Sequence, residues 1–101
     1  MLIHASSTAI DGNAVLLCGP SGNGKSDLAL RLIDGGAALV ADDRVLLEAV
    51  TSERGDHRLM ASAPAALFDL LEVRGLGIVR CDADSSMRLR LVINLDAAAI
   101  V

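Results

Sequence analysis

The stretch LLCGPSGNGKSDLAL, residues 16–30, decides the fold of this chain. Within it, residues 19–26 read Gly-Pro-Ser-Gly-Asn-Gly-Lys-Ser, a complete match to the pattern G-x-x-x-x-G-K-[ST]. The apolar run before the loop, residues 14–18, predicts a strand that is buried on both faces. Helical spacing follows the loop, in Leu28, Ala29, Leu32 and Ile33, and Gly35 and Gly36 are expected to end that helix.

A glycine loop between a strand and a helix predicts a nucleotide-binding site. Gly22 and Gly24 permit backbone angles and close approaches that a Cβ would block. The loop amides and the helix N-terminus can then face phosphate oxygens. Lys25 can reach the β- and γ-phosphates, and the Ser26 hydroxyl can coordinate Mg²⁺. The predicted nucleotide-binding residues are Gly19, Pro20, Ser21, Gly22, Asn23, Gly24, Lys25 and Ser26.

The composition indicates one small α/β domain, spanning residues 1–101. Apolar residues make up 52% of the chain and Phe68 is the one aromatic, so Leu, Val, Ile and Ala must build the core, as in a buried parallel sheet. The net charge of −4, without a basic run, argues against nucleic acid. We expect no membrane segment or secretory signal, reduced cysteines, a cytoplasmic location and subunit contacts within a homo-oligomer.

The rest of the chain predicts alternating strands, turns and short helices. Asp-Gly at 11–12 favours a hairpin turn, and Pro64 can open a short helix over 64–71. The final residues, 96–101, look like the start of another helix. The expected strands are 2–10, 37–41, a hairpin of 44–50 with 57–61, 74–81 and 88–95.

Acidic residues at strand ends are the next candidates. Asp42 and Asp43 close an apolar strand, where ligands of open α/β sheets collect. Neighbouring strand residues point to opposite faces, so one carboxylate could serve Mg²⁺ and the other an acceptor hydroxyl. Glu72 and Arg74 would share a face if residues 70–79 are extended. The residues alone also allow a turn-forming acidic pair at 42–43 and a surface ion pair at 72–74.

Four features together resemble the catalytic domain of the bacterial HPr kinase/phosphorylase family. They are His4 on the strand before the loop, GPSGNGKS, LVADD, and APAALFDLLEVRGLGIV. The resemblance covers about residues 4 to 95. It implies a P-loop α/β fold like that of phosphoenolpyruvate carboxykinase, with a mixed sheet flanked by helices and commonly assembled as a hexamer.

The resemblance also implies an activity and its residues. Family members transfer the γ-phosphoryl group of ATP to a serine of HPr, a phosphocarrier of the sugar phosphotransferase system, and reverse this with inorganic phosphate. By motif, Lys25 holds the β/γ-phosphates, and Ser26 and Glu72 coordinate Mg²⁺. Asp42, with Asp43 as the alternative, takes the serine proton. His4 belongs near the phosphates, and Arg74 to the segment linked to both directions of catalysis.

The chain also departs from the family pattern. Asp27 follows the loop serine where a glutamate is usual, and the larger N-terminal domain of many members is missing. Members continue past the position of Val101 with a basic loop, so a chain ending there is expected to bind nucleotide with weak or absent transfer. Two other functions stay open: a nucleotide-binding regulatory module without turnover, and a small-molecule kinase that shares only the loop.

Overall fold

The computed structural model describes residues 1–20, 24–73 and 75–95. These residues form nine strands, one α-helix and one 3-10 helix. In chain order the elements are β1 (Leu2–His4), β2 (Ser6–Ile10), β3 (Asn13–Cys18), α1 (Lys25–Asp34), β4 (Ala38–Ala41), β5 (Arg44–Thr51), β6 (His57–Ser62), η1 (Ala65–Leu67), β7 (Leu70–Val73), β8 (Gly77–Arg80) and β9 (Ser86–Asn94).

The sheet is mixed rather than parallel. Seven strands form it in the order β1-β5-β6-β9-β3-β2-β4, and β7 and β8 form a separate two-stranded sheet. Among the described ladders, only β3 with β9 is parallel. The expected mixed α/β class is confirmed, but the buried parallel sheet suggested by composition is wrong. Short turns join β2 to β3 and β5 to β6, and such turns permit only antiparallel pairing.

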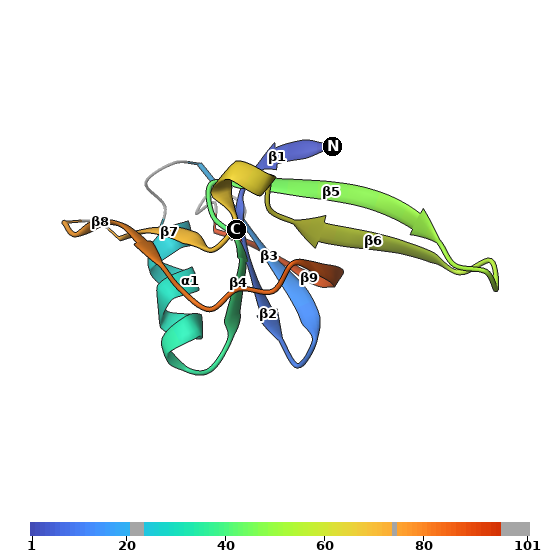
Figure 1. Ribbon diagram of the computed structural model, residues 1–101, viewed down its shortest axis with the longest axis horizontal. Helices are drawn as coiled ribbons and strands as arrows, with labels where there is room; N and C mark the ends of the chain where they lie inside the picture. The colour runs from blue at the N-terminus through green and yellow to red at the C-terminus, as the bar shows by residue number, and fades with distance from the viewer. Residues whose placement is uncertain (21–23, 74, 96–101) are drawn as a thin grey trace, which may run out of the picture.

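Apolar side chains cover both faces of the sheet. Along β3, Ala14 and Leu16 join one buried cluster, and Val15 and Leu17 join the other, as strand alternation requires. The second cluster lies under α1, whose Ala29 is fully buried there. Figure 1 shows α1 and the β7–β8 hairpin on the same side of the sheet.

The expected single strand over residues 2–10 is wrong. It divides at Ala5 into β1, which pairs with β5, and β2, which pairs with β3 and β4. The chain changes neighbours here, and the Ala5 amide donates to the Asp43 carbonyl oxygen at 3.2 Å. The predicted turn at 11–12 is confirmed, with positive φ at Asp11 and Gly12.

The helix expected over residues 64–71 is also wrong. Only Ala65–Leu67 is helical, as a 3-10 turn, and β7 begins at Leu70. Asp69 has a φ of +62°, which no helix continues through. Residues 70–79 are not one extended segment either, because the Leu76 amide donates to the Val73 carbonyl in the turn between β7 and β8. The extended segment on which the shared face of Glu72 and Arg74 was predicted is therefore interrupted by a turn.

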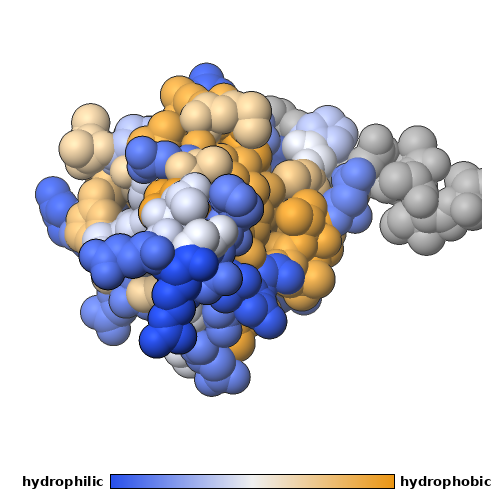
Figure 2. Space-filling model, turned by 90° about the vertical axis from the view of Figure 1, so that its right-hand side faces the viewer, coloured by the Kyte–Doolittle hydropathy of each residue, from blue (hydrophilic) through white to orange (hydrophobic). Residues whose placement is uncertain are grey.

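The β5–β6 hairpin extends away from the body of the molecule (Figure 1). Its polar tip faces the viewer in Figure 2, with apolar surface gathered behind it. Exposed large apolar side chains include Val50 and Leu59 on this hairpin and Leu91 and Val92 on β9. The expected homo-oligomer stays a prediction. No described helix is long and apolar enough to cross a membrane.

Candidate active site

Among the described residues, the helix after the glycine loop begins without a side-chain cap. Gly24 is the N-cap residue of α1, with a φ of +83° and no side chain to cap the first amides. A Cβ at Gly24 would meet no atom within 4 Å, so the backbone angle rather than space requires glycine. The predicted helix is confirmed, and its uncapped first-turn N–H groups suit an anion. Of the loop residues predicted to bind nucleotide, Ser21, Gly22 and Asn23 lie outside the described residues.

Lys25 turns back over the loop. Its side chain is largely buried, at 7% exposed, and Nζ donates a hydrogen bond to the carbonyl oxygen of Gly19. The ammonium group is therefore held next to Gly19, the residue that follows the end of β3. An incoming phosphate could replace that carbonyl as its partner at little cost, since a phosphate oxygen is the stronger acceptor.

Asp42 is the central carboxylate of the site. It follows β4 and is 6% exposed. Its Oδ1 accepts hydrogen bonds from Ser6 Oγ and Ser26 Oγ, both at 2.8 Å, and its Oδ2 accepts one from the Glu72 amide at 2.9 Å. One side chain thus joins β2, the start of α1 and β7. Ser6 was not among the sequence predictions because it lies outside the motifs, and Glu72 was predicted through its side chain and not its amide.

Asp43 lies next to Asp42 but in a different environment. Its side chain is 58% exposed, and its Oδ1 lies 3.3 Å from His4 Nε2. Its φ is +69°, and the Arg44 amide donates to the Asp42 carbonyl at 2.8 Å, which makes Asp43 the centre of the rarer, more strained form of γ-turn. One of the two adjacent carboxylates is therefore buried and the other is exposed. Both residues lie beyond the end of β4, so the turn at Asp43 separates them and not the strand alternation expected from the sequence.

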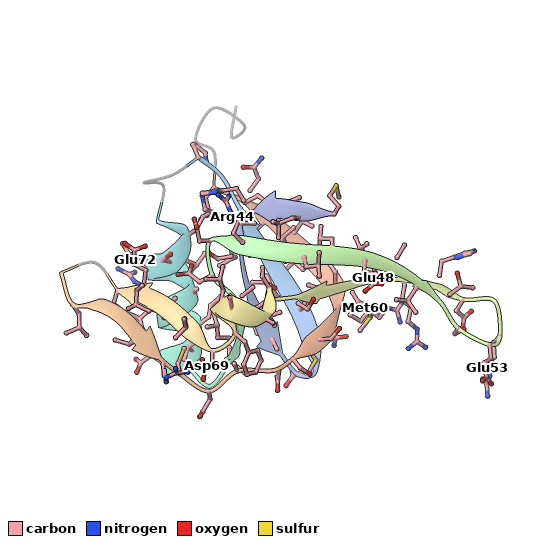
Figure 3. The ribbon with its side chains drawn as sticks, turned by 45° about the horizontal axis from the view of Figure 1, so that its top comes forward. Arg44, Glu48, Glu53, Met60, Asp69 and Glu72 are labelled. Carbon is pink, nitrogen blue, oxygen red and sulfur yellow. The ribbon has the colours of Figure 1, made fainter. Side chains whose placement is uncertain are left out.

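Glu72 is the third acidic residue of this region, after Asp42 and Asp43. It is exposed on β7, the strand that packs beside α1. Figure 3 shows Glu72 and Arg44 on the body of the molecule, far from Glu53 at the tip of the β5–β6 hairpin. Among the described residues no group of three or more His, Cys, Asp and Glu side chains could hold a metal ion. A hydroxyl, a carboxylate and substrate phosphates suit Mg²⁺ better than an all-protein cage.

Arg74 and His4 were also predicted to belong to the site. Arg74 lies outside the described residues, so its position beside Glu72 stays a prediction. His4 does lie beside Asp43 at the edge of the site. The sequence predicted reduced cysteines at positions 18 and 81. Both are free thiols, and burial followed by the nearby carboxylates of Asp69, Asp42 and Asp82 raises the pKa of Cys81.

The fold is a mixed α/β domain. Its candidate site lies where α1 begins, next to the buried carboxylate of Asp42 and the exposed carboxylate of Asp43. The chain belongs to the HPr Serine kinase C-terminal domain family, which matches residues 1–99. This finding confirms the family resemblance drawn from the four sequence features.

Individual relatives agree. The chain is 38% identical to the HPr kinase/phosphorylase of Caldanaerobacter subterraneus subsp. tengcongensis and 42% identical to HPr kinase/phosphorylase 1 of Oceanobacillus iheyensis. Each alignment covers 93% of this chain, but only 32% and 31% of those relatives, so the chain spans about a third of their length. The solved Hpr(Ser) kinase/phosphatase of Coxiella burnetii matches 93% of this chain and 64% of its own, with 29% identity and a TM-score of 0.81.

Proposed function

We propose that this chain binds Mg·ATP in a P-loop and transfers the γ-phosphoryl group to a serine hydroxyl of HPr. The observation that carries the proposal is the Asp42 carboxylate, which links the loop residue Ser26 to the Glu72 strand and leaves Asp43 exposed next to it. Family membership and the names of the relatives support HPr as acceptor. The reverse reaction, phosphorolysis of phosphoserine by inorganic phosphate, would use the same groups.

The loop and Lys25 would bind the ATP phosphates. The uncapped amides of α1 favour negative charge, and the ammonium group is already held next to Gly19. Lys25 would exchange the Gly19 carbonyl for β- and γ-phosphate oxygens. These fixed positive charges would stabilise the negative charge on the phosphoryl group in the transition state. Such stabilisation is the main requirement of phosphoryl transfer.

Mg²⁺ fits the oxygen ligands present here. Ser26 donates its hydroxyl hydrogen to Asp42, which leaves the oxygen lone pairs free for a cation. Glu72 would supply the second protein oxygen, and the substrate phosphates the others. Bound there, the cation would neutralise charge on the β- and γ-phosphates. Asp42 is then a residue that orients Ser26 and anchors β7.

Asp43 is the better proton acceptor of the pair. The Asp42 carboxylate is buried and already accepts three hydrogen bonds, whereas the Asp43 side chain is exposed beside His4. An acceptor side chain on another protein can reach only the exposed group. The serine oxygen would bond to the γ-phosphorus as its proton passes to Asp43, and ADP leaves with the electrons of the broken bond. This favours the alternative that the sequence left open.

The deciding experiment is transfer of labelled γ-phosphate from ATP to purified HPr, with Lys25→Ala and Asp43→Asn variants. We expect serine-bound label with the unchanged chain, and none with either variant. Mg·ATP binding should persist in Asp43→Asn and weaken in Lys25→Ala. Binding without transfer in every form would indicate a nucleotide-binding module instead. Transfer to a small molecule but not to HPr would indicate the third class.

A further inference from the structure

Arg44 makes a contact that neither the sequence motifs nor the proposed chemistry accounts for. Its Nη1 lies 2.8 Å from His4 Nδ1, in a hydrogen bond between two exposed side chains. The two residues are direct partners in the antiparallel ladder of β1 with β5, so their side chains leave the same face of the sheet. The contact therefore follows from strand register.

The chemistry of this pair fixes the hydrogen on the imidazole ring. A guanidinium group has five N–H donors and no acceptor. Nδ1 of His4 must therefore be the acceptor, and a neutral ring carries its hydrogen on Nε2. The contact with Arg44 therefore selects one of the two tautomers of the neutral ring.

The other ring nitrogen faces the proposed proton acceptor. His4 Nε2 lies 3.3 Å from Asp43 Oδ1, within ion-pair distance, so the nitrogen that carries the hydrogen is the one next to the carboxylate. The charged groups that described contacts bring to His4 are thus Asp43, in the turn after β4, and Arg44, at the start of β5. Arg44, His4 and Asp43 form a continuous row of contacts.

We propose that Arg44 is a positioning residue, which holds His4 as the Nε2–H tautomer so that its ring orients the Asp43 carboxylate. The strained turn at Asp43 makes such support useful. With a φ of +69°, the backbone of Asp43 gains little from regular pairing, although its carbonyl accepts the Ala5 amide. A carboxylate on such a turn needs a side-chain partner to hold one orientation. The tautomer does not depend on the proposed function, but the catalytic consequence rests on it.

The tautomer can be measured directly by long-range ¹H–¹⁵N NMR of the imidazole rings. The chain has two histidines, so His57→Gln leaves His4 as the only signal. We expect the Nε2–H form in this background, and a mixture of both tautomers after Arg44→Leu. Arg44→Lys keeps a cationic donor and should restore part of the Nε2–H population. Arg54→Leu, in the exposed β5–β6 loop, removes the same charge far from the site and should change nothing.

The transfer assay provides the functional readout. Arg44→Leu should lower kcat about tenfold or more, since it disorders a general base without removing it, and should leave KM for ATP unchanged. Arg44→Lys should recover part of that loss. An Nδ1–H tautomer in the unsubstituted site, or an unchanged His4 spectrum in a folded Arg44→Leu variant, would overturn the proposal. Absence of HPr phosphorylation would count against the proposed function only, because the NMR result decides the tautomer by itself.

Discussion

Ser26 Oγ donates a hydrogen bond to Asp42 Oδ1 at 2.8 Å, although the two residues are 16 positions apart in the chain. The first residue belongs to the first turn of α1 and the second follows β4. This bond ties the glycine loop to the acidic end of the sheet. The same carboxylate accepts the Glu72 amide, so three segments meet at one buried group.

Asp42→Asn is expected to destabilise the fold. An amide has one acceptor oxygen instead of two, and its NH₂ group would face donors from Ser6, Ser26 or Glu72. The loss of buried, charge-assisted bonds should lower the free energy of unfolding by about 1–3 kcal/mol, measured by urea denaturation. Mg²⁺-dependent ATP binding should weaken as well. Unchanged stability would contradict the described hydrogen bonds of Asp42.

Asp43→Asn is the matched substitution at the neighbouring residue. It is expected to leave stability unchanged and to reduce activity. Its side chain is exposed, so stability should stay within about 0.5 kcal/mol of the unchanged chain. Under the proposed function, phosphate transfer to HPr should fall by about 100-fold or more, with ATP affinity retained. Calorimetric titration measures the ATP affinity, and the labelled-phosphate assay measures the transfer to HPr. Full activity in this variant would return the role of base to Asp42.

Thr8→Val tests a buried hydroxyl without a partner. Thr8 is fully buried on β2, and its Oγ1 has no hydrogen-bond partner in the described structure. Valine keeps the shape and removes the polar atom, so the free energy of unfolding should be unchanged or rise by up to about 1 kcal/mol. The adjacent Ser7 is equally buried, but its hydroxyl donates to the Val15 carbonyl at 2.8 Å. Ser7→Ala should therefore cost about 1 kcal/mol.

Cys81 should react with iodoacetamide only at higher pH in the folded chain. Burial and the Asp69 carboxylate raise the pKa of its thiol above the ordinary value of 9.0. The thiolate is the reacting form, so a raised pKa leaves less of it at each pH below that value. Mass spectrometry of Cys81 alkylation across a pH series should give a higher midpoint than the same cysteine in urea. Coinciding midpoints for the folded and unfolded chain would show that the shift is absent.

Elements of the fold could be predicted well where residues close together in the chain determine them. The helix after the loop, the Asp-Gly turn and the hairpin of β5 with β6 follow from spacing and turn residues, and they are confirmed. The strand over residues 2–10 and the helix after Pro64 were wrong. At Ala5 the chain exchanges one set of partner strands for another, and at Asp69 a positive φ turns it into β7. The partners at Ala5 are distant in the chain, whereas β7 pairs with the nearby β8.

The sequence by itself determined the chemistry available to this protein. The order of glycines, Lys25 and Ser26 predicts a phosphate-binding loop, and paired aspartates at the end of an apolar run supply acidic groups for the same site. These signals are local, because each depends on residues within one turn or one strand end.

Only the tertiary structure decided which of the adjacent aspartates is buried and which is exposed. β2 pairs with β4, and α1 and β7 pack against these strands. Asp42 is therefore buried against Ser6, Ser26 and the Glu72 amide, while Asp43 is turned outward to His4. The register of β1 against β5 sets His4 opposite Arg44. Two adjacent aspartates look alike in sequence, and they differ here because burial and hydrogen-bond partners come from segments far away in the chain.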